Sequence, residues 1–436
     1  MVKKIILIVV NLFIISLLGF VLYEIYTNFL EVQNIFVKIG IVIILSFTLI
    51  VILRYMMLLY FSIIKLVFKS SENTDNSVKP TFKVTIIVPA YNEEKVLPIS
   101  IPSLINQTYE NLEILIVDDG STDSTFTVAK RYEFEHENRS LKVLRKVNSG
   151  KANAINHGIK HSKGEIIMVV DADSRLEKNA VELMVRYFLN PEIAAVAGSV
   201  YVSNQKNFIT KLQALEYIEG LNMVRNGQAF LKLVNIIPGP IGMFRKNALY
   251  DVGLYDDDTF AEDCDVTLKL ITHGYKIDFE SDAVAYTEAP ENFLDLIKQR
   301  YRWTRGILQA IKKHKYLLWH FKKNPSASFT MWYMLFESVF WPFMDVWTNL
   351  FIMYLAIVSG FTILVFFWWV MFTILDMAGA LYCILVTGES LSLVFYAAFY
   401  RLFFIEFINI VKILATFEEW FGVEMSWGKL ERKGNL

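Results

Sequence analysis

Acidic side chains follow two apolar runs of the sequence, where they could hold a cation or move a proton. Asp118 and Asp119 end the first run, and Asp171 and Asp173 end the second. Two carboxylates placed two residues apart can bind one hard cation, and Mg²⁺ or Mn²⁺ carrying the oxygens of a diphosphate is the natural occupant. Both patterns are also common in turns and helix N-caps, so neither establishes a metal or nucleotide site by itself.

A lysine and a second pair of acids carry side chains suited to phosphate binding and proton transfer. Lys151 follows Gly150 at the start of a predicted helix, where its ammonium and the exposed N–H groups would both favour phosphate. Asp263 follows Glu262 before an apolar helix, so it could act as a general base toward a hydroxyl group. A solvated lysine and a partner of the helix dipole are the alternatives at these two positions.

A basic and aromatic helix is predicted around residues 299–303. Spacing of three and four residues places Gln299, Arg302 and Trp303 on one face of it. Arginine can grip a diphosphate, and tryptophan can stack on the face of a sugar ring. An amphipathic helix at a membrane surface, with Trp303 among the lipid headgroups, explains the same pattern equally well.

The overall composition points to a membrane protein. Of 436 residues, 54% are hydrophobic and 20% are charged, whereas an average soluble chain has roughly 45–50% apolar and about 25% charged residues. The net charge of -1 gives no overall electrostatic attraction to nucleic acid. The two cysteines, Cys264 and Cys383, exclude a disulfide scaffold and a multi-cysteine metal site.

Long apolar runs stand toward both ends of the chain. Four of them supply the roughly 20 residues that a membrane-spanning helix needs, namely 5–23, 39–68, 340–358 and 361–386. A further run, 391–417, contains Arg401, Glu406 and Lys412. Because charges at mid-membrane cost about 2.5–3.5 kcal/mol each, we expect this run to lie at the interface or to re-enter the membrane. The distribution of lysine and arginine places the N-terminus and the region after residue 68 in the cytoplasm.

Between residues 83 and 171, short Val- and Ile-rich runs alternate with helix-like segments. This alternation predicts a parallel sheet that helices cover on both faces. Ligands in such sheets bind beyond the carboxyl ends of the strands, which here are the polar segments 90–93, 118–120 and 171–173. The cation-binding groups are therefore expected at one edge of the sheet.

The sequence thus predicts a helical membrane protein with an inserted cytoplasmic α/β domain. The predicted boundaries are two transmembrane helices in 1–69, a linker at 70–79, the cytoplasmic domain at 80–290, amphipathic interfacial helices at 291–339, two transmembrane helices at 340–388, and an interfacial or re-entrant helix with a cytoplasmic tail at 389–436.

Six motifs in this order resemble those of the processive family 2 glycosyltransferases, which include poly-N-acetylglucosamine, hyaluronan, chitin and cellulose synthases. The motifs are VPAYNEE, VDDGSTDST, NSGKANAIN, VVDADS, FAED and QRYRW. In its length, its two N-terminal spans and the stretch 258–309, the chain is most similar to bacterial poly-beta-1,6-N-acetylglucosamine synthases. The resemblance implies a Rossmann-like GT-A domain inserted between N- and C-terminal transmembrane helices.

The resemblance also implies roles for the residues that match the motifs. Asp171 and Asp173 would coordinate Mg²⁺ or Mn²⁺, and Asp263 would be the catalytic base. The nucleotide-sugar site would comprise Pro89, Ala90, Tyr91, Glu93, Asp118, Asp119, Lys151, Asp171, Ala172 and Asp173, with Tyr91, Glu93 and Asp119 at the uridine and Lys151 near the diphosphate. The acceptor would contact Glu262, Gln299, Arg302, Trp303, Gly239 and Pro240, and Trp427 with Lys429 would form a gating segment.

The sequence departs from the family pattern at two places. Ala261 replaces the usual threonine before the acid pair. The segment 238–245 stands where poly-N-acetylglucosamine synthases usually carry a Ser-Gly pair, and it is closer to the corresponding segment of hyaluronan synthases. Because this loop is expected near the acceptor, acceptor and linkage are the least constrained part of the interpretation.

The implied function is inverting polymerisation of a UDP-sugar, with UDP-N-acetylglucosamine (UDP-GlcNAc) favoured, and export of the exopolysaccharide across the bacterial cytoplasmic membrane. The expected partners are the UDP-sugar, the growing polysaccharide, the lipid bilayer and a small membrane or export subunit. The alternatives are a beta-glucan, hyaluronan-like or chitin-like synthase, an enzyme that adds one sugar to a membrane lipid, and a degenerate transferase acting as a sensor or scaffold. Retention of all the acidic motif residues disfavours the degenerate transferase, and Q-x-x-R-W favours processivity.

Overall fold

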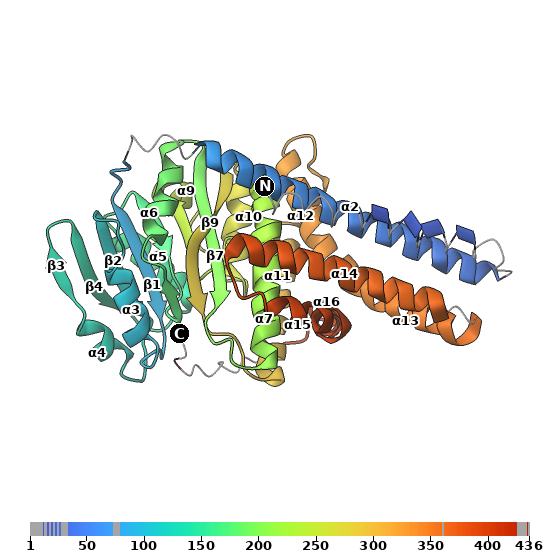
Figure 1. Cartoon of the computed structure of the whole chain (residues 1–436). Coiled ribbons are helices and arrows are strands. Elements are labelled where there is room, and N and C mark those ends of the chain that lie inside the picture. Colours follow the sequence, from blue (N-terminus) through green and yellow to red (C-terminus); the bar gives the residue numbers. More distant parts are fainter. Residues whose placement is uncertain are drawn as a thin grey trace.

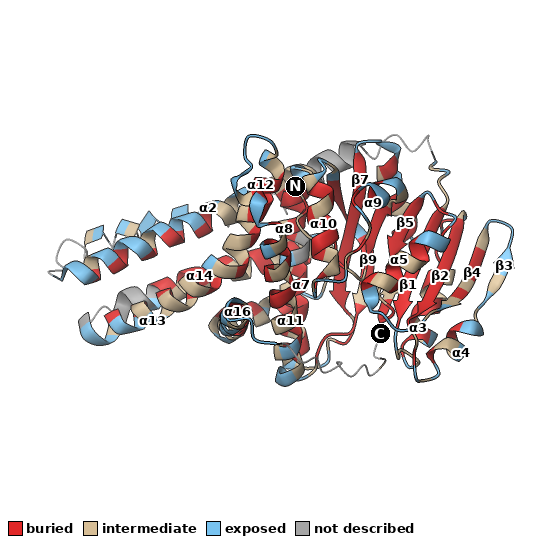
Figure 2. Ribbon diagram, turned by 180° about the vertical axis from the view of Figure 1, so that it is seen from behind, coloured by how far each residue is buried: buried red, intermediate tan, exposed pale blue. Residues whose placement is uncertain are grey.

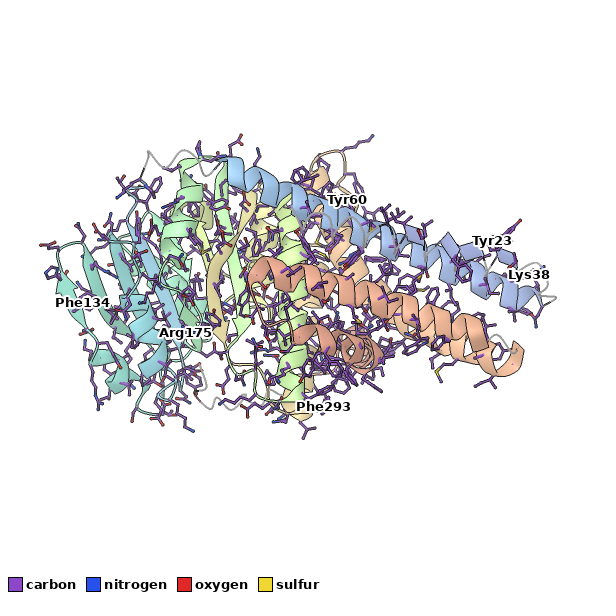
Figure 3. The ribbon with its side chains drawn as sticks, viewed as in Figure 1. Tyr23, Lys38, Tyr60, Phe134, Arg175 and Phe293 are labelled. Carbon is purple, nitrogen blue, oxygen red and sulfur yellow. The ribbon has the colours of Figure 1, made fainter. Side chains whose placement is uncertain are left out.

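The computed structural model describes residues 34–72, 79–359, 362–424 and 434, together with scattered positions between 12 and 27. It contains an α/β domain and a group of long apolar helices that extend from one end of it (Figure 1). In Figure 3, Phe134 marks the edge strand of the domain, and Lys38 marks the far end of the apolar helices. Most of the predicted first transmembrane run and of the linker lies outside the described residues.

Within the described residues, one nine-stranded mixed sheet forms the centre of the domain, with the order β3-β4-β2-β1-β5-β8-β7-β9-β6. The strands are β1 (Val84–Ala90), β2 (Leu112–Asp118), β3 (Phe134–His136), β4 (Arg139–Arg145), β5 (Ile166–Val169), β6 (Ser174–Leu176), β7 (Ile193–Val202), β8 (Gly242–Arg245) and β9 (Lys276–Thr287). The parallel pairing of β4, β2, β1 and β5 agrees with the sequence prediction. The antiparallel strands β3, β6 and β8 make the sheet mixed rather than purely parallel.

The register of the parallel strands brings their acid-rich ends to one edge of the sheet. Ala90 at the end of β1 pairs with Asp118 at the end of β2, and Ile87 pairs with Val169 at the end of β5. Every residue of β1 and β2 is buried, as expected for strands that helices cover on both faces. The segments that follow β1, β2 and β5 therefore leave the sheet side by side.

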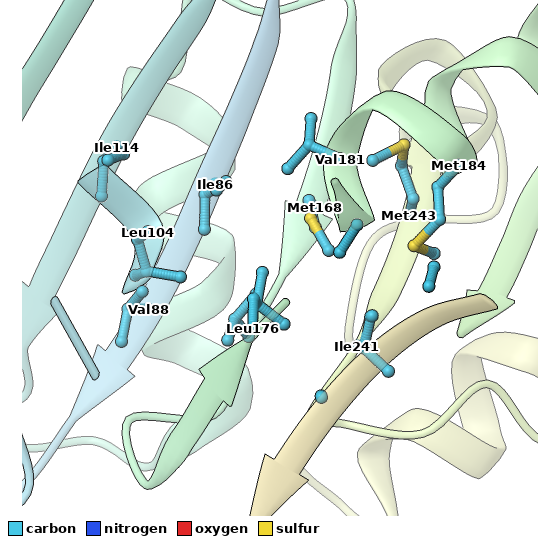
Figure 4. Close-up of a cluster of buried hydrophobic side chains, with 14 of the residues drawn as sticks. Ile86, Val88, Leu104, Ile114, Met168, Leu176, Val181, Met184, Ile241 and Met243 are labelled. Atoms are coloured by element: carbon cyan, nitrogen blue, oxygen red, sulfur yellow. The ribbon is translucent and has the colours of Figure 1, made fainter. Parts of the chain in front are cut away.

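Two apolar cores lie on opposite faces of the sheet. Because successive side chains of a strand point to opposite faces, Ile86 and Ile87 belong to different cores. Figure 4 shows the first core, where Ile86 and Val88 lie near Leu104. Figure 2 shows buried residues running through the sheet and along the helix surfaces that face it.

Shorter helices cover the sheet, and one long helix borders the site described below. The covering helices are α3 (Leu97–Ile105), α4 (Thr125–Lys130), α5 (Lys151–His161), α6 (Ala180–Val185), α7 (Phe208–Ile218), α8 (Val224–Phe230), α9 (Lys246–Asp251) and α10 (Glu262–Thr272). The long helix is α11 (Phe293–Lys313), and a π-helical turn, η2 (Glu219–Met223), joins α7 to α8.

The apolar helices carry four described stretches that are long and apolar enough to cross a membrane. These stretches are Ile35–Lys65, Pro325–Val358, Trp368–Thr387 and Leu393–Trp420. They are built from α2 (Ile35–Glu72), α12 (Pro325–Leu335), the π-helical turn η4 (Phe336–Phe340), α13 (Trp341–Ser359), α14 (Thr362–Thr387), α15 (Leu393–Phe399), the π-helical turn η5 (Tyr400–Phe404) and α16 (Ile405–Trp420). Large apolar side chains such as Phe36 (78% exposed) and Leu53 (60% exposed) face outward on α2, as lipid-facing residues would.

The last apolar stretch runs across the others. Figure 1 shows α16 nearly end-on, whereas α2, α13 and α14 lie along the plane of the view. The charges of this stretch have polar partners: Arg401 lies 3.3 Å from Asp345, and Asn349 donates a hydrogen bond to Glu406 at 2.5 Å. Its length and composition would also allow it to cross a membrane, so its interfacial position and the number of spans stay predictions.

A buried ion pair joins α2 to the domain. The Nζ of Lys65 lies 2.5 Å from Oδ1 of Asp278 in β9 and donates a second hydrogen bond to the carbonyl of Phe279 at 2.7 Å. The side chain of Asp278 is 1% exposed, and Lys232 also pairs with it. Burial raises the pKa of Asp278, but the two lysines outweigh this and leave the pKa below its ordinary value. The end of α2 is thus fixed to the sheet.

We predict that Lys65→Met destabilises the protein. Removing one partner of a buried pair typically costs about 3–5 kcal/mol, and because Lys232 would still face Asp278 we expect the lower part of this range. The measurement is the midpoint of thermal unfolding in detergent. Lys65→Met combined with Asp278→Leu should recover most of the loss, since no unpaired carboxylate remains; equal midpoints for wild type and Lys65→Met would contradict this role.

Candidate active site

Two polar loops meet where β1 and β2 end. The backbone N–H of Asn92 donates to Oγ of Ser121 at 2.9 Å, and the N–H of Glu93 donates to Oγ1 of Thr125 at 2.7 Å. Pro89 and Ala90 belong to β1 itself, and the side chain of Tyr91 is 40% exposed at this edge. The predicted uridine-binding segment is therefore a surface that both loops build together.

The carboxylates at the end of β2 are occupied by protein groups. Asp118 lies 3.1 Å from the guanidinium Nε of Arg145. Asp119 lies 2.5 Å from Nζ of Lys146 and accepts a hydrogen bond from the N–H of Gly150 at 2.9 Å. Gly150 has a φ of 93°, which favours glycine, and it directly precedes α5. Asp119 therefore fixes the loop that presents Lys151.

Lys151 connects the two acidic motifs. Its Nζ lies 2.8 Å from Oδ1 of Asp171 and 2.7 Å from Oε1 of Glu262. Loss of hydration lowers the pKa of Lys151, but the carboxylates of Asp171, Glu262 and Asp263 outweigh it and raise the pKa well above its ordinary value. One ammonium thus bridges the segment after β5 and the first turn of α10.

Gly239 approaches both acidic motifs. Its N–H donates a hydrogen bond to Oδ2 of Asp263 at 3.3 Å. A Cβ at this position would lie 2.9 Å from Oδ2 of Asp171 and 3.0 Å from Nζ of Lys151. Glycine is therefore required for the loop 238–240 to approach both motifs so closely. The neighbouring Pro240 is half-buried.

Asp263, the predicted catalytic base, is a carboxyl group with a raised pKa. It lies in the first turn of α10, and the N–H of Cys264 donates to its Oδ1 at 2.8 Å. Burial raises the pKa of Asp263 to about 6, the carboxylate of Glu262 adds to this rise, and Lys151 opposes it. A carboxyl group with a pKa near 6 is ionised at neutral pH and still basic enough to accept a proton from a hydroxyl group.

Helix α11 places the Q-x-x-R-W residues beside the sheet. Gln299 is buried and accepts a hydrogen bond from Nη1 of Arg300 at 2.5 Å. Trp303 packs against the first core, with its ring 6.3 Å from that of Tyr217. The guanidinium of Arg300 lies 4.3 Å from the ring centroid of Trp303. Arg302 is half-buried on the same helix.

A close backbone approach holds α11 against the acid pair. A Cβ at Gly306 would lie 2.7 Å from both the Cβ and the N of Ala261. Ala261 precedes Glu262 at the start of α10, and it is the residue that replaces the family's threonine. The contact leaves no room for a larger side chain at 306 and sets the distance between Asp263 and the α11 motif.

A second acidic cluster is already neutralised by a lysine. Asp256, Asp258 and Asp265 place carboxylate oxygens within 4.8 Å of one another. The Nζ of Lys313 lies 2.6, 2.7 and 3.1 Å from these three side chains, and Nε2 of His314 lies 2.7 Å from Asp265. The cluster therefore ties α11 to α10.

The pair after β5 fits a divalent cation better. Asp171 and Asp173 offer carboxylate oxygens, the ligands that Mg²⁺ and Mn²⁺ prefer. Asp171 is partly exposed to the cleft, and Gly239 leaves the space beside it free of a side chain. Asp173 and Ala172 are buried behind it.

Sequence reasoning missed two buried arginines near this cleft. Arg300 pairs with Glu216 at 2.5 Å. Arg225 in α8 is 8% exposed, and its Nη1 has no hydrogen-bond partner among the described residues. The only signal in the sequence was a single cation in an otherwise uncharged helix, VRNGQAF. The predicted gating residues Trp427 and Lys429 lie outside the described residues.

The domain has a GT-A fold, as the sequence predicted. A solved structure with the same arrangement is a mannosyltransferase from Pyrobaculum calidifontis in complex with GDP-Man and Mn²⁺. It superimposes with a TM-score of 0.62 over 88% of this chain and 99% of that one, at 21% sequence identity. The likeness concerns the fold. Because it covers 88% of this chain, it includes most of the apolar helices.

Sequence comparison confirms the resemblance drawn from the motifs. Residues 85–253 match the family model Glycosyl transferase family 2. Poly-beta-1,6-N-acetyl-D-glucosamine synthase of Staphylococcus aureus (strain COL) is 30% identical over 270 residues, which are 62% of this chain and 64% of that protein. The Staphylococcus epidermidis synthase is 32% identical over 257 residues, 59% of this chain and 61% of the relative. The chain thus matches less than two thirds of the length of these relatives.

We predict that Gly306→Ala lowers activity without unfolding the protein. Alanine improves helix propensity by about 1 kcal/mol, but its Cβ would push α11 away from Ala261 and Asp263. We expect at least about a tenfold loss of turnover, since small misplacements of reacting groups are costly. Nucleotide release by purified variants is the measurement.

The exposed Lys298→Ala on the same helix is the matched control and should keep full turnover. Adding Ala261→Gly to Gly306→Ala should restore part of the activity, because one of the two clashing Cβ atoms is gone. Full turnover by Gly306→Ala alone would contradict the role of this contact.

Proposed function

We propose that this protein is an inverting glycosyltransferase that polymerises a sugar from a UDP-sugar at the cytoplasmic face of a bacterial membrane, with UDP-GlcNAc as donor and a beta-1,6-linked polymer as product. The observation that carries the proposal is the cluster in which Lys151 bridges Asp171 and Glu262 while Gly239 contacts Asp263. The relatives' names support the donor and the product.

The geometry suits a single displacement at the anomeric carbon. Asp263 takes the proton of the acceptor hydroxyl as that oxygen attacks the sugar, and the bond to the diphosphate breaks on the opposite face. An alpha-linked donor then gives a beta linkage. Lys151 lies 2.8 Å from Asp171, and in this proposal its ammonium stabilises the negative charge of the departing UDP.

Asp171 and Asp173 would hold Mg²⁺ or Mn²⁺, which supplies charge neutralisation for the diphosphate when bound. Gln299, Arg302 and Trp303 belong to the acceptor side in this proposal, with Trp303 under the terminal sugar of the chain. Retention of the sugar chain between additions would make the enzyme processive. The apolar helices next to α11 would carry the polymer outward, with or without a small membrane or export subunit.

The test is UDP release by wild type and Asp263→Asn in nanodiscs with Mg²⁺ or Mn²⁺, across UDP-GlcNAc, UDP-glucose, UDP-galactose and UDP-glucuronate. We expect wild type to turn over UDP-GlcNAc and make material that a beta-1,6-hexosaminidase cuts. Asp263→Asn should bind UDP normally but lose about 10³-fold or more of its turnover, since it lacks the base. The exposed Asp282→Asn is the control and should behave as wild type.

If the wild type turned over only a UDP-sugar other than UDP-GlcNAc, the assignment of the donor would be wrong, and the proposed mechanism would stand. Substantial polymer synthesis by Asp263→Asn would overturn the assignment of the base. Release of no UDP from any donor by the wild type would overturn the proposed function.

The pH profile offers a further prediction. Because Asp263 acts only when ionised and burial raises its pKa to about 6, activity should fall about tenfold per pH unit below that value. Glu262 adds to the rise in pKa, so Glu262→Gln should move the acidic limb of kcat/KM to lower pH. Glu110 is exposed at the opposite edge of the sheet, so Glu110→Gln is the control and should leave the acidic limb of kcat/KM unchanged. An acidic limb that does not shift in Glu262→Gln would contradict the effect of Glu262 on the pKa of Asp263.

A further inference from the structure

A cavity of about 220 Å³ lies between the domain and the apolar helices. Its walls come from η2, α8, α11, η4 and α16, and they include Arg225, Thr304, Glu337 and Lys412. The volume equals that of about seven water molecules in the liquid. This space admits a single sugar ring but not a whole nucleotide.

The cavity contains a buried donor without a partner. Arg225 is 8% exposed, and its Nη1 is buried with no hydrogen-bond partner among the described residues. Leaving a buried charged donor unsatisfied costs more than the roughly 1–3 kcal/mol of a neutral group. A guanidinium can only donate hydrogen bonds, so Nη1 is available to a hydrogen-bond acceptor that enters the cavity.

Arg225 and the α11 motif meet at this cavity. Burial lowers the pKa of Arg225 to about 10, and the carboxylate of Asp263 opposes this shift. Thr304, which lines the same cavity, directly follows Trp303 of the α11 motif. A ligand in this cavity therefore contacts the helix that carries Trp303.

The remaining lining suits a neutral sugar. Apolar side chains alternate with neutral hydrogen-bonding groups, which match the C–H face and the hydroxyl groups of a pyranose; they include Ile236, Ile307, Gln228 and Asn235. Glu337, which pairs with Arg54, and Lys412 place charges of opposite sign in the wall. Apart from Arg225, the side chains that line the cavity therefore carry no net charge, which suits a neutral ligand.

We propose that Arg225 binds the acceptor, with its Nη1 donating a hydrogen bond to an oxygen of the polymer's terminal sugar in this cavity. This inference rests on the proposed function and names the residue that holds the acceptor for Asp263. The donor sugar nucleotide, which sits at Lys151 and Asp171, does not depend on it.

The test compares Arg225→Gln and Arg225→Lys with wild type in nanodiscs, using a short beta-1,6-linked N-acetylglucosamine oligosaccharide as primer. Losing a hydrogen bond from a charged donor should raise the KM for the primer at least about tenfold. The KM for the donor should stay within about twofold, and Arg225→Lys, which keeps the charge, should fall between. Arg131→Gln, an exposed arginine in the same domain, is the control.

A second variant tests the cavity itself and guards against misfolding of the first. Val224→Phe would fill the cavity from α8 and should also raise the KM for the primer while sparing the KM for the donor. Unchanged primer KM in both Arg225→Gln and Val224→Phe would overturn this inference alone. If a polyprenyl phosphate inhibited the wild type and Arg225→Gln relieved that inhibition, the cavity would be assigned to a lipid instead. An inactive wild type would overturn both the proposed function and this inference.

Discussion

One ammonium in a cleft of carboxylates is the interaction on which the site depends. Asp171 comes from the segment after β5, whereas Glu262 and Asp263 are neighbours at the start of α10, and like charges at this proximity repel unless a cation stands between them. Lys151 provides that cation. Because its position is set by Asp119 through the loop before α5, the end of β2 is coupled to the acid pair of α10 although neither touches the other. A bound diphosphate with its metal ion would add negative and positive charges to this group of one ammonium and three carboxylates.

The contacts of α11 extend this arrangement toward the membrane. Gly306 lets the helix touch Ala261 beside the base, and the ammonium of Lys313 fastens its far end to the carboxylates around Asp265. On its other side α11 borders the cavity that holds Arg225 and Lys412. Helix α11 therefore contacts the start of α10 through Gly306 and also contributes Thr304 and Ile307 to the cavity beside the apolar helices.

Much of this was predictable from local sequence, and the rest depends on contacts between distant segments. Continuous Val and Ile runs predicted β1, β2, β4 and β5 and the edge at which Asp171 lies. The antiparallel strand β8 was not predicted, because its four residues show no hydrophobic periodicity of their own. It forms only by insertion between β5 and β7. Asp119 was assigned to uridine by resemblance, whereas its bonds to Lys146 and Gly150 arise from tertiary structure. Arg225 was missed because burial, not residue type, makes it unusual.

The most direct test of the central claim is a structure of Asp263→Asn with UDP-GlcNAc and Mn²⁺. The account predicts the diphosphate at Lys151, with the metal ion on Asp171 and Asp173. It also predicts residue 263 on the face of the anomeric carbon opposite the UDP, within hydrogen-bond reach of an acceptor hydroxyl. A diphosphate bound away from Lys151, or residue 263 on the same face as the leaving group, would contradict it.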